Sequence, residues 1–227
     1  NFTKVRGQAG SLEPFNMGRY TAIVKYKTSF YSFYLPVVFA MNMAGYSDKR
    51  MYRQAREILL EIGHYFQVTD DYLDCFGDPE VIGKIGTDIQ DGKCSWLIVK
   101  ALEIASEEEK KILTQHYGSH DEVDISIIKQ LYQKLQIQQR LDIMKAIFIK
   151  VLCPKLTASV MNFPRKSSQR SLKGLQAKHV NDLLSAQSLI VNSIDIMYTT
   201  KSIFLIILIS QQVYLKTIDI SNLENLP

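Results

Sequence analysis

A dense run of charged side chains between residues 64 and 96 most constrains what this chain can fold into. The run, HYFQVTDDYLDCFGDPEVIGKIGTDIQDGKCSW, places three carboxylates at the end of a strongly helical segment. These are Asp70, Asp71 and Asp74, and the charged residues that follow among glycines are Lys84, Asp88, Asp91 and Lys93. Packing of an apolar core does not account for so many charges beside apolar residues, whereas a polyanion bridged by divalent cations does.

The helix that carries these carboxylates is predicted from about Lys49 to Cys75. Steps of four residues along it pass through Ile62, Phe66, Asp70 and Asp74. Two carboxylates therefore continue a line that is apolar one turn earlier, and they lie at the helix end where the macrodipole disfavours negative charge. Carboxylates in that position need nearby positive charge to stay ionised. A solvated helix end is the alternative interpretation.

The rest of the pattern predicts helices and no convincing strand, so the fold class is all-α. The other expected helices run from Arg19 to about Ala44, from about Asp91 to Ser106, from Glu107 to Tyr117, and from about Asp124 to Leu135. Pro36 is expected to kink the first of them, and Gly45 to end it. Ser47 or Asp48 is the expected N-cap of the carboxylate-bearing helix.

After about residue 137 the sequence changes in character. Residues 138–180 lack a clean apolar stripe, and SSQRSLKG within them is typical of a linker. The apolar run Ile203–Ile209 has only seven residues, whereas a membrane helix needs about 20. We therefore expect two parts: residues 1–137, and a divergent tail of residues 138–227 that is partly helical or irregular, with no membrane span.

Composition is that of a globular protein: 227 residues, 46% hydrophobic and 22% charged, with a net charge of +4. This mild positive charge suits an anionic ligand but not nucleic acid. The cysteines, Cys75, Cys94 and Cys153, have no metal-binding spacing, which favours packing thiols in a reducing compartment. No signal peptide is visible, and a start at Asn1 indicates a fragment or an incomplete gene model.

Several common catalytic motifs are excluded. Two glycine-bounded stretches end at Lys84 and Lys93, but their spacing is wrong and neither lysine precedes Ser or Thr, so no Walker A motif is present. His116 and His120 are four residues apart without a third ligand, which indicates surface histidines. No sequence context supports a nucleophilic Ser or Cys.

The central stretch suits magnesium and phosphate. Mg²⁺ prefers oxygen ligands and shares them between carboxylates and substrate phosphates, which suits Asp70 and Asp74 one turn apart. Lys27 and Thr28 add a charge and a hydroxyl, and Gln67 adds an amide. An aromatic helix wall is formed by Phe30, Tyr31, Phe33 and Tyr34. The implied ligand has an anionic head and an apolar tail.

Three segments carry a family resemblance: KYKTSFYSFYLP at 25–36, FQVTDDYLDCFGDPEVIGKIGTDIQDGKCSWL at 66–97, and LYQKL at 131–135. They resemble the eukaryotic farnesyl diphosphate synthases, short-chain trans-isoprenyl diphosphate synthases of the polyprenyl synthetase family. The resemblance implies that residues 1–137 are the C-terminal part of such a domain. It also implies a partial isoprenoid synthase helical bundle around a central cavity, usually in a cytoplasmic homodimer, although a mitochondrial location stays open.

The implied reaction condenses isopentenyl diphosphate with dimethylallyl or geranyl diphosphate to farnesyl diphosphate, with Mg²⁺ assisting ionisation of the allylic diphosphate. By the motif match, the magnesium ligands would be Asp70, Asp71 and Asp74. The residues that contact the allylic diphosphate would be Lys27, Thr28, Gln67, Lys84 and Lys93. Lys27, Thr28 and Lys84 would act in catalysis, and Asp88 would hold the lysine loop in place.

The sequence also departs from the family pattern. The family has two aspartate-rich motifs, but Asp70–Asp71 is the only adjacent aspartate pair here, and the basic C-terminus is replaced by LENLP. Three hypotheses follow: an incomplete or divergent prenyltransferase that is weakly active or inactive alone, a terpene synthase-like lyase, and a non-catalytic or degenerate protein that pairs with an intact synthase. GKIGTDIQDGK disfavours the lyase, because this lysine loop resembles the transferases.

Overall fold

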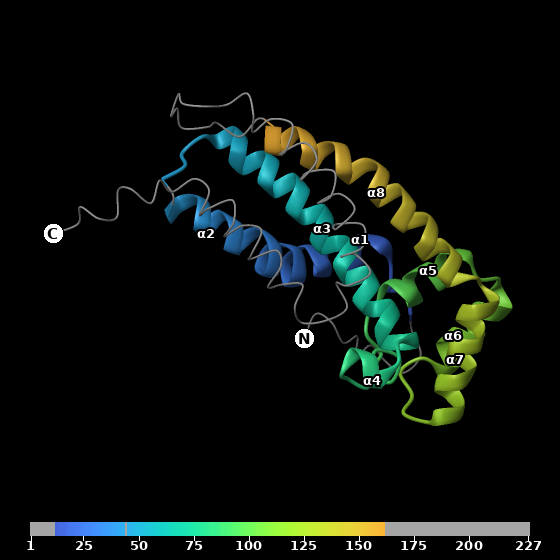
Figure 1. Cartoon of the computed structure of the whole chain (residues 1–227). Coiled ribbons are helices and arrows are strands. Elements are labelled where there is room, and N and C mark those ends of the chain that lie inside the picture. Colours follow the sequence, from blue (N-terminus) through green and yellow to red (C-terminus); the bar gives the residue numbers. More distant parts are fainter. Residues whose placement is uncertain (1–11, 44, 162–227) are drawn as a thin grey trace. The chain divides into compact units, whose positions relative to one another are not determined.

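The structure, a computed structural model, describes residues 12–43 and 45–161, without the side chains of Cys153 and residues 156–161. In this part of the chain every regular element is a helix (Figure 1), so the predicted all-α fold class is confirmed. The elements are α1 Met17–Val24, η1 Lys25–Tyr34, α2 Leu35–Met43, α3 Lys49–Phe76, α4 Pro79–Ile82, α5 Trp96–Ile104, α6 Glu107–His116, α7 Glu122–Lys134 and α8 Ile137–Met161.

The described residues form two compact units. The first unit comprises residues 12–35 and 56–148, and it contains all the residues predicted to bind metal or diphosphate. The second comprises residues 36–43, 45–55 and 149–161. Helices α3 and α8 contribute residues to both units, so neither unit is one continuous stretch of sequence.

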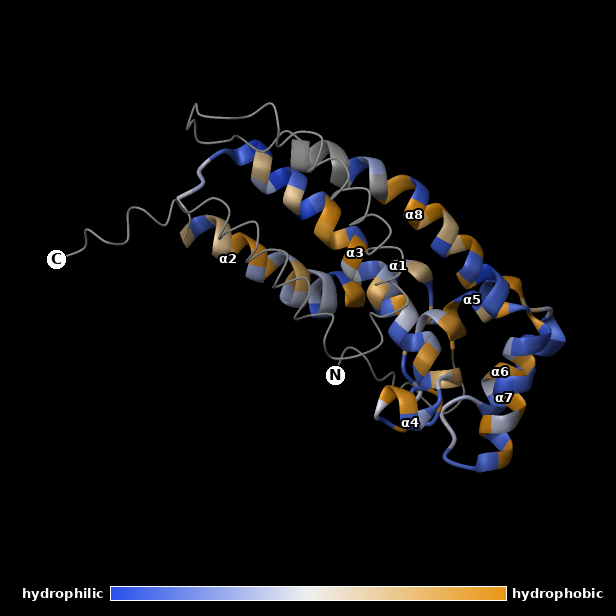
Figure 2. Cartoon of the chain, viewed as in Figure 1, coloured by the Kyte–Doolittle hydropathy of each residue, from blue (hydrophilic) through white to orange (hydrophobic). Residues whose placement is uncertain are grey.

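Helix α5 is enclosed in the core of the first unit. Its residues Trp96, Leu97, Ile98, Val99 and Ala101 are each at most 2% exposed. A helix that is apolar nearly all round is typical of burial among other helices. The core residues around it include Tyr20 from α1, Val68 from α3, Leu113 from α6, Ile128 from α7 and Ile137 from α8. In α3, by contrast, hydrophilic and hydrophobic residues alternate along the helix (Figure 2).

Helix ends lie where capping residues were predicted. The Asp48 carboxylate accepts a hydrogen bond from the Arg50 N–H at 2.8 Å, which confirms Asp48 as the cap of α3. Gly45 follows the end of α2 with φ +73°, a conformation that glycine adopts without strain. In the second unit, the Tyr52 hydroxyl lies 3.0 Å from Asn42 Oδ1 and 2.9 Å from the Tyr46 carbonyl oxygen. These contacts join the end of α2 to the first turns of α3.

The predicted helix from Arg19 to Ala44 is present, but its middle is not α-helical. Lys25–Tyr34 is a π-helix, and the Leu35 N–H donates to the Phe30 carbonyl oxygen five residues earlier. The π-helix ends just before Pro36, which has no N–H to continue a regular ladder. The kink expected at Pro36 stays a prediction, whereas the π-helix was not predicted; π-helical turns often accompany functional sites.

Other boundaries differ from the sequence prediction. Helix α5 begins at Trp96 instead of Asp91, because residues 91–95 belong to a turn in which Gly92 has φ +59°. The short helix α4 lies between the predicted helices that end near Cys75 and begin near Asp91, where no helix was predicted. Helix α8 extends through residues 137–161, where no clean stripe was visible, and includes Pro154. The boundary predicted near residue 137 stays a prediction, and both SSQRSLKG and Ile203–Ile209 lie outside the described residues.

None of the helices in the described part of the chain combines the length and the apolar character that crossing a membrane requires.

Candidate diphosphate and metal site

Three segments of the first unit line a small cavity of about 130 Å³. One face of α1 and η1 contributes residues at intervals of three and four, from Tyr20 to Thr28. One face of α3 contributes Gln67 and the three carboxylates, and the connection from α4 to α5 contributes Lys84, Asp88 and Lys93. Every residue that the sequence predicts to bind metal or diphosphate lines this cavity, together with Asp88.

Asp70 and Asp74 share one ammonium group. Lys84 Nζ lies 3.1 Å from Asp70 Oδ1 and 3.6 Å from Asp74 Oδ1. The Asp70 side chain is 40% exposed and that of Asp74 only 8%, while that of Lys84 is 44% exposed. Burial alone would lower the pKa of Lys84, but the two carboxylates outweigh it and raise the pKa. The positive charge that the inward carboxylates need is therefore supplied by a lysine of the neighbouring loop.

Asp71 differs from its neighbours because it is buried and both its oxygens accept short hydrogen bonds from uncharged protein groups. Gln67 Nε2 donates to Oδ1 at 2.7 Å, and the Trp96 N–H donates to Oδ2 at 2.7 Å. The side chain is buried, and burial raises the pKa of Asp71 to about 7 despite these bonds. The Tyr20 hydroxyl adjoins this carboxylate in a geometry short of a regular hydrogen bond.

The contact with Trp96 gives Asp71 a structural role. Trp96 is the first residue of α5, and the Ser95 side chain at the N-cap position makes no capping hydrogen bond. The Asp71 carboxylate instead satisfies a free N–H of the first turn, where negative charge also interacts favourably with the helix dipole. Asp71 thus links α3 to the start of α5, and it is less suited to metal coordination than Asp70 and Asp74.

A polar chain connects η1 to α3. Thr28 Oγ1 donates to Gln67 Oε1 at 2.6 Å, and Gln67 Nε2 in turn donates to Asp71 and weakly to Asp70, 3.4 Å away. This chain fixes the orientation of the Gln67 amide. Lys27, on the same helix as Thr28, is exposed and makes no ion pair with any residue in the described part of the chain.

The loop that carries the lysines is anchored to the end of α3. The Asp88 N–H donates to Asp74 Oδ2 at 2.8 Å, and Asp88 Oδ1 accepts from Lys93 Nζ at 2.8 Å. Lys93 also lies 3.4 Å from Asp91, and the Tyr117 hydroxyl donates to the Lys93 carbonyl oxygen at 2.7 Å. The predicted role of Asp88 in holding this loop agrees with these contacts.

The donor set fits a magnesium ion that is completed by a ligand. Among the described residues no group of three or more His, Cys, Asp or Glu side chains converges as a ready-made metal site. Mg²⁺ usually binds through one or two carboxylates plus substrate phosphates, which is what Asp70 and Asp74 offer. Lys84 Nζ already lies between the Oδ1 atoms of Asp70 and Asp74, so a cation is electrostatically favoured at this position. Four aspartates against three lysines line the cavity, so a polyanion also needs added cations to bind.

The predicted aromatic wall does not line this cavity. Phe33 is buried and packs on Phe66, with ring centroids 5.3 Å apart. Phe30 stacks on Tyr26 and contacts Tyr34, while Tyr31 is 71% exposed. None of these four side chains lines the cavity, so they do not form one apolar surface beside the carboxylates. The cavity therefore suits the anionic head of the predicted ligand and leaves its apolar tail without a described site.

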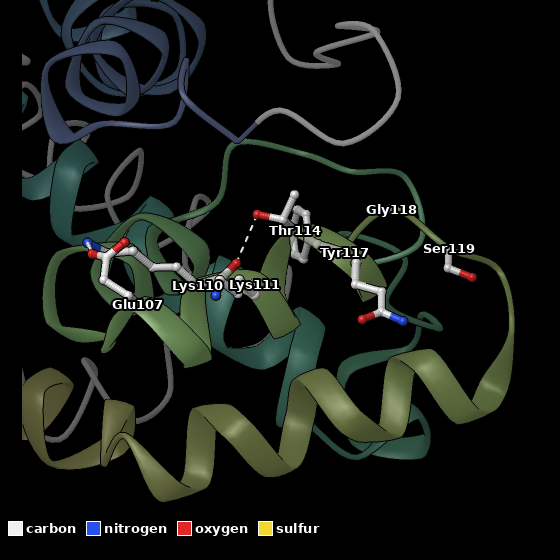
Figure 3. A pocket seen from close by; sticks show the side chains of 8 residues that line it. Glu107, Lys110, Lys111, Thr114, Tyr117, Gly118 and Ser119 are labelled. Atoms are coloured by element: carbon white, nitrogen blue, oxygen red, sulfur yellow. Dashed lines mark hydrogen bonds and ion pairs between the residues drawn. The ribbon is translucent and has the colours of Figure 1, made fainter.

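A larger hollow of about 770 Å³ lies elsewhere on the first unit, on α6 and the turn after it (Figure 3). It is shallow and open, and Glu107, Lys110, Lys111 and Ser119 are among its lining residues. The Thr114 hydroxyl donates to the Lys110 carbonyl oxygen within it, at 2.9 Å. No carboxylate pair and none of the predicted binding residues line this hollow, so size alone does not make it the functional site.

Sequence reasoning missed three contributors to the site: Tyr20, the Trp96 N–H and Tyr117. Tyr20 lies two turns before Thr28 on a continuous helical face, so its position was visible in the spacing. The other two reach the site from elements distant in sequence, and no local pattern indicates them.

The all-helical fold is that of an isoprenoid synthase-like protein, and comparisons with known proteins agree. The model of the family described as "Polyprenyl synthetase" matches residues 5–135. A farnesyl pyrophosphate synthase of Artemisia annua is 47% identical over 74% of this chain and 47% of its own length. That of Saccharomyces cerevisiae is 53% identical over 56% of this chain and 36% of its own length. The chain belongs to the polyprenyl synthetase family.

A solved structure supports the same fold. The farnesyl diphosphate synthase of T. brucei, complexed with a bisphosphonate, superposes with a TM-score of 0.56 and 33% sequence identity. The superposition covers 65% of this chain and 49% of that protein. The chain thus spans about half the length of the curated relatives it matches.

Proposed function

We propose that this chain carries the allylic-diphosphate side of a prenyltransferase site, in which isopentenyl diphosphate condenses with dimethylallyl or geranyl diphosphate to farnesyl diphosphate. One observation carries the proposal: Asp70, Asp74 and Lys84 meet in one cavity with the Thr28–Gln67 pair. Carboxylates for a divalent cation and lysines for phosphate are the groups that ionisation of an allylic diphosphate requires.

Each side chain has a role in this proposal. Asp70 and Asp74 hold Mg²⁺, which when bound neutralises negative charge on the departing diphosphate. Lys84, Lys93 and the exposed Lys27 contact phosphate oxygens as point charges. Thr28 and Gln67 offer a hydroxyl and an amide to the same ligand, and Asp71 positions Gln67 and α5. We also infer a cytoplasmic homodimer, or a dimer with an intact synthase.

The named relatives support the diphosphate as ligand. The T. brucei protein is complexed with a bisphosphonate, whose two phosphonate groups resemble a diphosphate. A second candidate function is a non-catalytic, diphosphate-binding partner of an intact synthase. It is favoured by this sequence, in which Asp70–Asp71 is the only adjacent aspartate pair.

Asp70→Asn is expected to weaken Mg²⁺-dependent binding of inorganic diphosphate at least about tenfold, because one of two charged oxygen donors is lost. Isothermal titration with and without Mg²⁺ measures the effect. The matched control is Asp142→Asn, which removes the same charge from an exposed position of α8 outside the cavity. Equal affinity of Asp70→Asn and wild type for magnesium diphosphate contradicts the proposal.

Turnover separates the two candidate functions. The purified chain is assayed with Mg²⁺, labelled isopentenyl diphosphate and geranyl diphosphate, alone and mixed with an intact synthase. Farnesyl product from the chain alone, lost in Asp70→Asn, supports the prenyltransferase. Magnesium diphosphate binding without turnover, together with altered turnover of the added synthase, supports the non-catalytic partner.

A further inference from the structure

We infer that Lys84 is a built-in counterion of the carboxylate pair, which Asp70 and Asp74 exchange for a divalent cation when the site is loaded. The inference rests on the proposed function and deepens it. It makes Lys84 a competitor of the metal in the empty site and a phosphate ligand in the loaded one.

The competition follows from which oxygens are available. Asp74 Oδ2 accepts a hydrogen bond from the Asp88 N–H at 2.8 Å, and Asp70 Oδ2 lies 3.4 Å from Gln67 Nε2. The remaining oxygens are Oδ1 of each carboxylate, and these are the two atoms that Lys84 Nζ contacts. An ammonium and a divalent cation repel each other strongly at such short range, so the same two oxygens hold only one of them.

The loop is built so that the side chain moves and the backbone stays. The Asp88–Asp74 hydrogen bond fixes the backbone, and Gly86 lies against the last turn of α3. The Lys84 side chain is 44% exposed, and Gly83, whose Cβ position is open, precedes it. Lys84 therefore leaves the carboxylates by rotating its own flexible stem, without unpacking the core.

The exchange couples cation and diphosphate. In the empty site a cation must displace Lys84 to reach both carboxylates, which weakens its binding. A diphosphate attracts the displaced ammonium, so its presence lowers the cost of that displacement. By linkage, each ligand then strengthens binding of the other through Lys84.

Binding of Mn²⁺ alone tests the exchange, with free Mn²⁺ followed by electron paramagnetic resonance. Lys84→Met is expected to bind Mn²⁺ about tenfold more tightly than wild type, because the competing charge is gone. Lys27→Met is the matched control: it removes the same charge from the same cavity, but from a lysine without an ion pair among the described residues. The double variant Lys84→Met with Asp70→Asn is expected to lose the gain.

A second readout follows Lys84 directly. Lysine acylation of the wild-type chain, quantified by mass spectrometry, is expected to become several-fold faster at Lys84 on adding Mg²⁺, because the amine is released from its contacts with Asp70 and Asp74. Lys110, which pairs with Glu107 outside the cavity, is the internal reference.

The outcomes separate the inference from the proposed function. If Mn²⁺ binding depends on Asp70 but is equally tight in wild type and Lys84→Met, the counterion inference is overturned. The proposed metal site is then unaffected. If neither wild type nor any variant binds Mn²⁺, with or without diphosphate, both the counterion inference and the proposed function are overturned. If Lys27→Met binds Mn²⁺ as tightly as Lys84→Met, the inference is also overturned. The loss of any one positive charge from the cavity would then explain the higher affinity.

Discussion

Gly86→Ala is expected to lower the affinity for magnesium diphosphate about 100-fold, because a displaced lysine loop loses charged hydrogen bonds to the ligand, each worth about 1.5–3 kcal/mol. An alanine Cβ at this position would overlap the carbonyl oxygen of Asp74 and lie 2.5 Å from its carbonyl carbon. These are backbone atoms of α3, so the loop itself must move. That movement takes Lys84 and Lys93 away from the positions in which they would contact the diphosphate, and it breaks the bond from the Asp88 N–H to Asp74. Isothermal titration measures the loss.

Gly83→Ala is the matched control for this prediction. It adds the same methyl group to the same loop, where the methyl meets nothing within 4 Å. Gly83 has φ +73°, so alanine there costs about 1 kcal/mol of backbone strain but causes no clash. We expect its diphosphate affinity to stay within a few-fold of wild type. Equal affinities of Gly86→Ala and wild type would show that the loop position does not matter for binding.

The fold was predictable to the extent that local patterns determine it. The amphipathic pattern of α3 and its Asp48 cap are properties of neighbouring residues, and both are present as predicted. The π-helix was not predictable, because its hydrogen bonds join residues five apart without changing the composition of the segment. Helix α8 was missed since its apolar residues fall on several sides, with Leu141 buried and Ile143 exposed.

The site shows the same division between local and distant effects. Periodicity placed Asp70 and Asp74 on the inward line of α3, yet Asp71 is more deeply buried than either. The reason is α5, whose first N–H points at Asp71 from 25 residues away in sequence. A one-dimensional pattern cannot contain that partner. Likewise, the pairing of Lys84 with two carboxylates depends on a loop path set by Gly86 and Asp88.

The close packing of η1 against α3 beside the site makes Gly63 sensitive to substitution. Gly63 of α3 faces Ser29 of η1 within the first unit, and a Cβ on Gly63 would lie 2.6 Å from Ser29 Cα and 2.8 Å from its Cβ. The Ser29 hydroxyl also donates to the Leu60 carbonyl oxygen at 3.2 Å, so η1 and α3 are in close contact here. Only glycine at position 63 permits this approach, and the Thr28–Gln67 hydrogen bond lies one turn further along the same contact.

Gly63→Ala is therefore expected to lower the free energy of unfolding by about 2 kcal/mol. Overpacking against backbone costs about 3 kcal/mol, and the higher helix propensity of alanine returns about 1 kcal/mol. Urea denaturation followed by circular dichroism measures the change. Gly18→Ala in α1 is the control, because its Cβ meets only the Asn16 side chain, at 3.3 Å, and it is expected to be nearly neutral. Since the clash separates η1 from α3, Gly63→Ala should also weaken diphosphate binding at low urea, where the chain remains folded. A fully stable Gly63→Ala variant would contradict the close approach of the two helices.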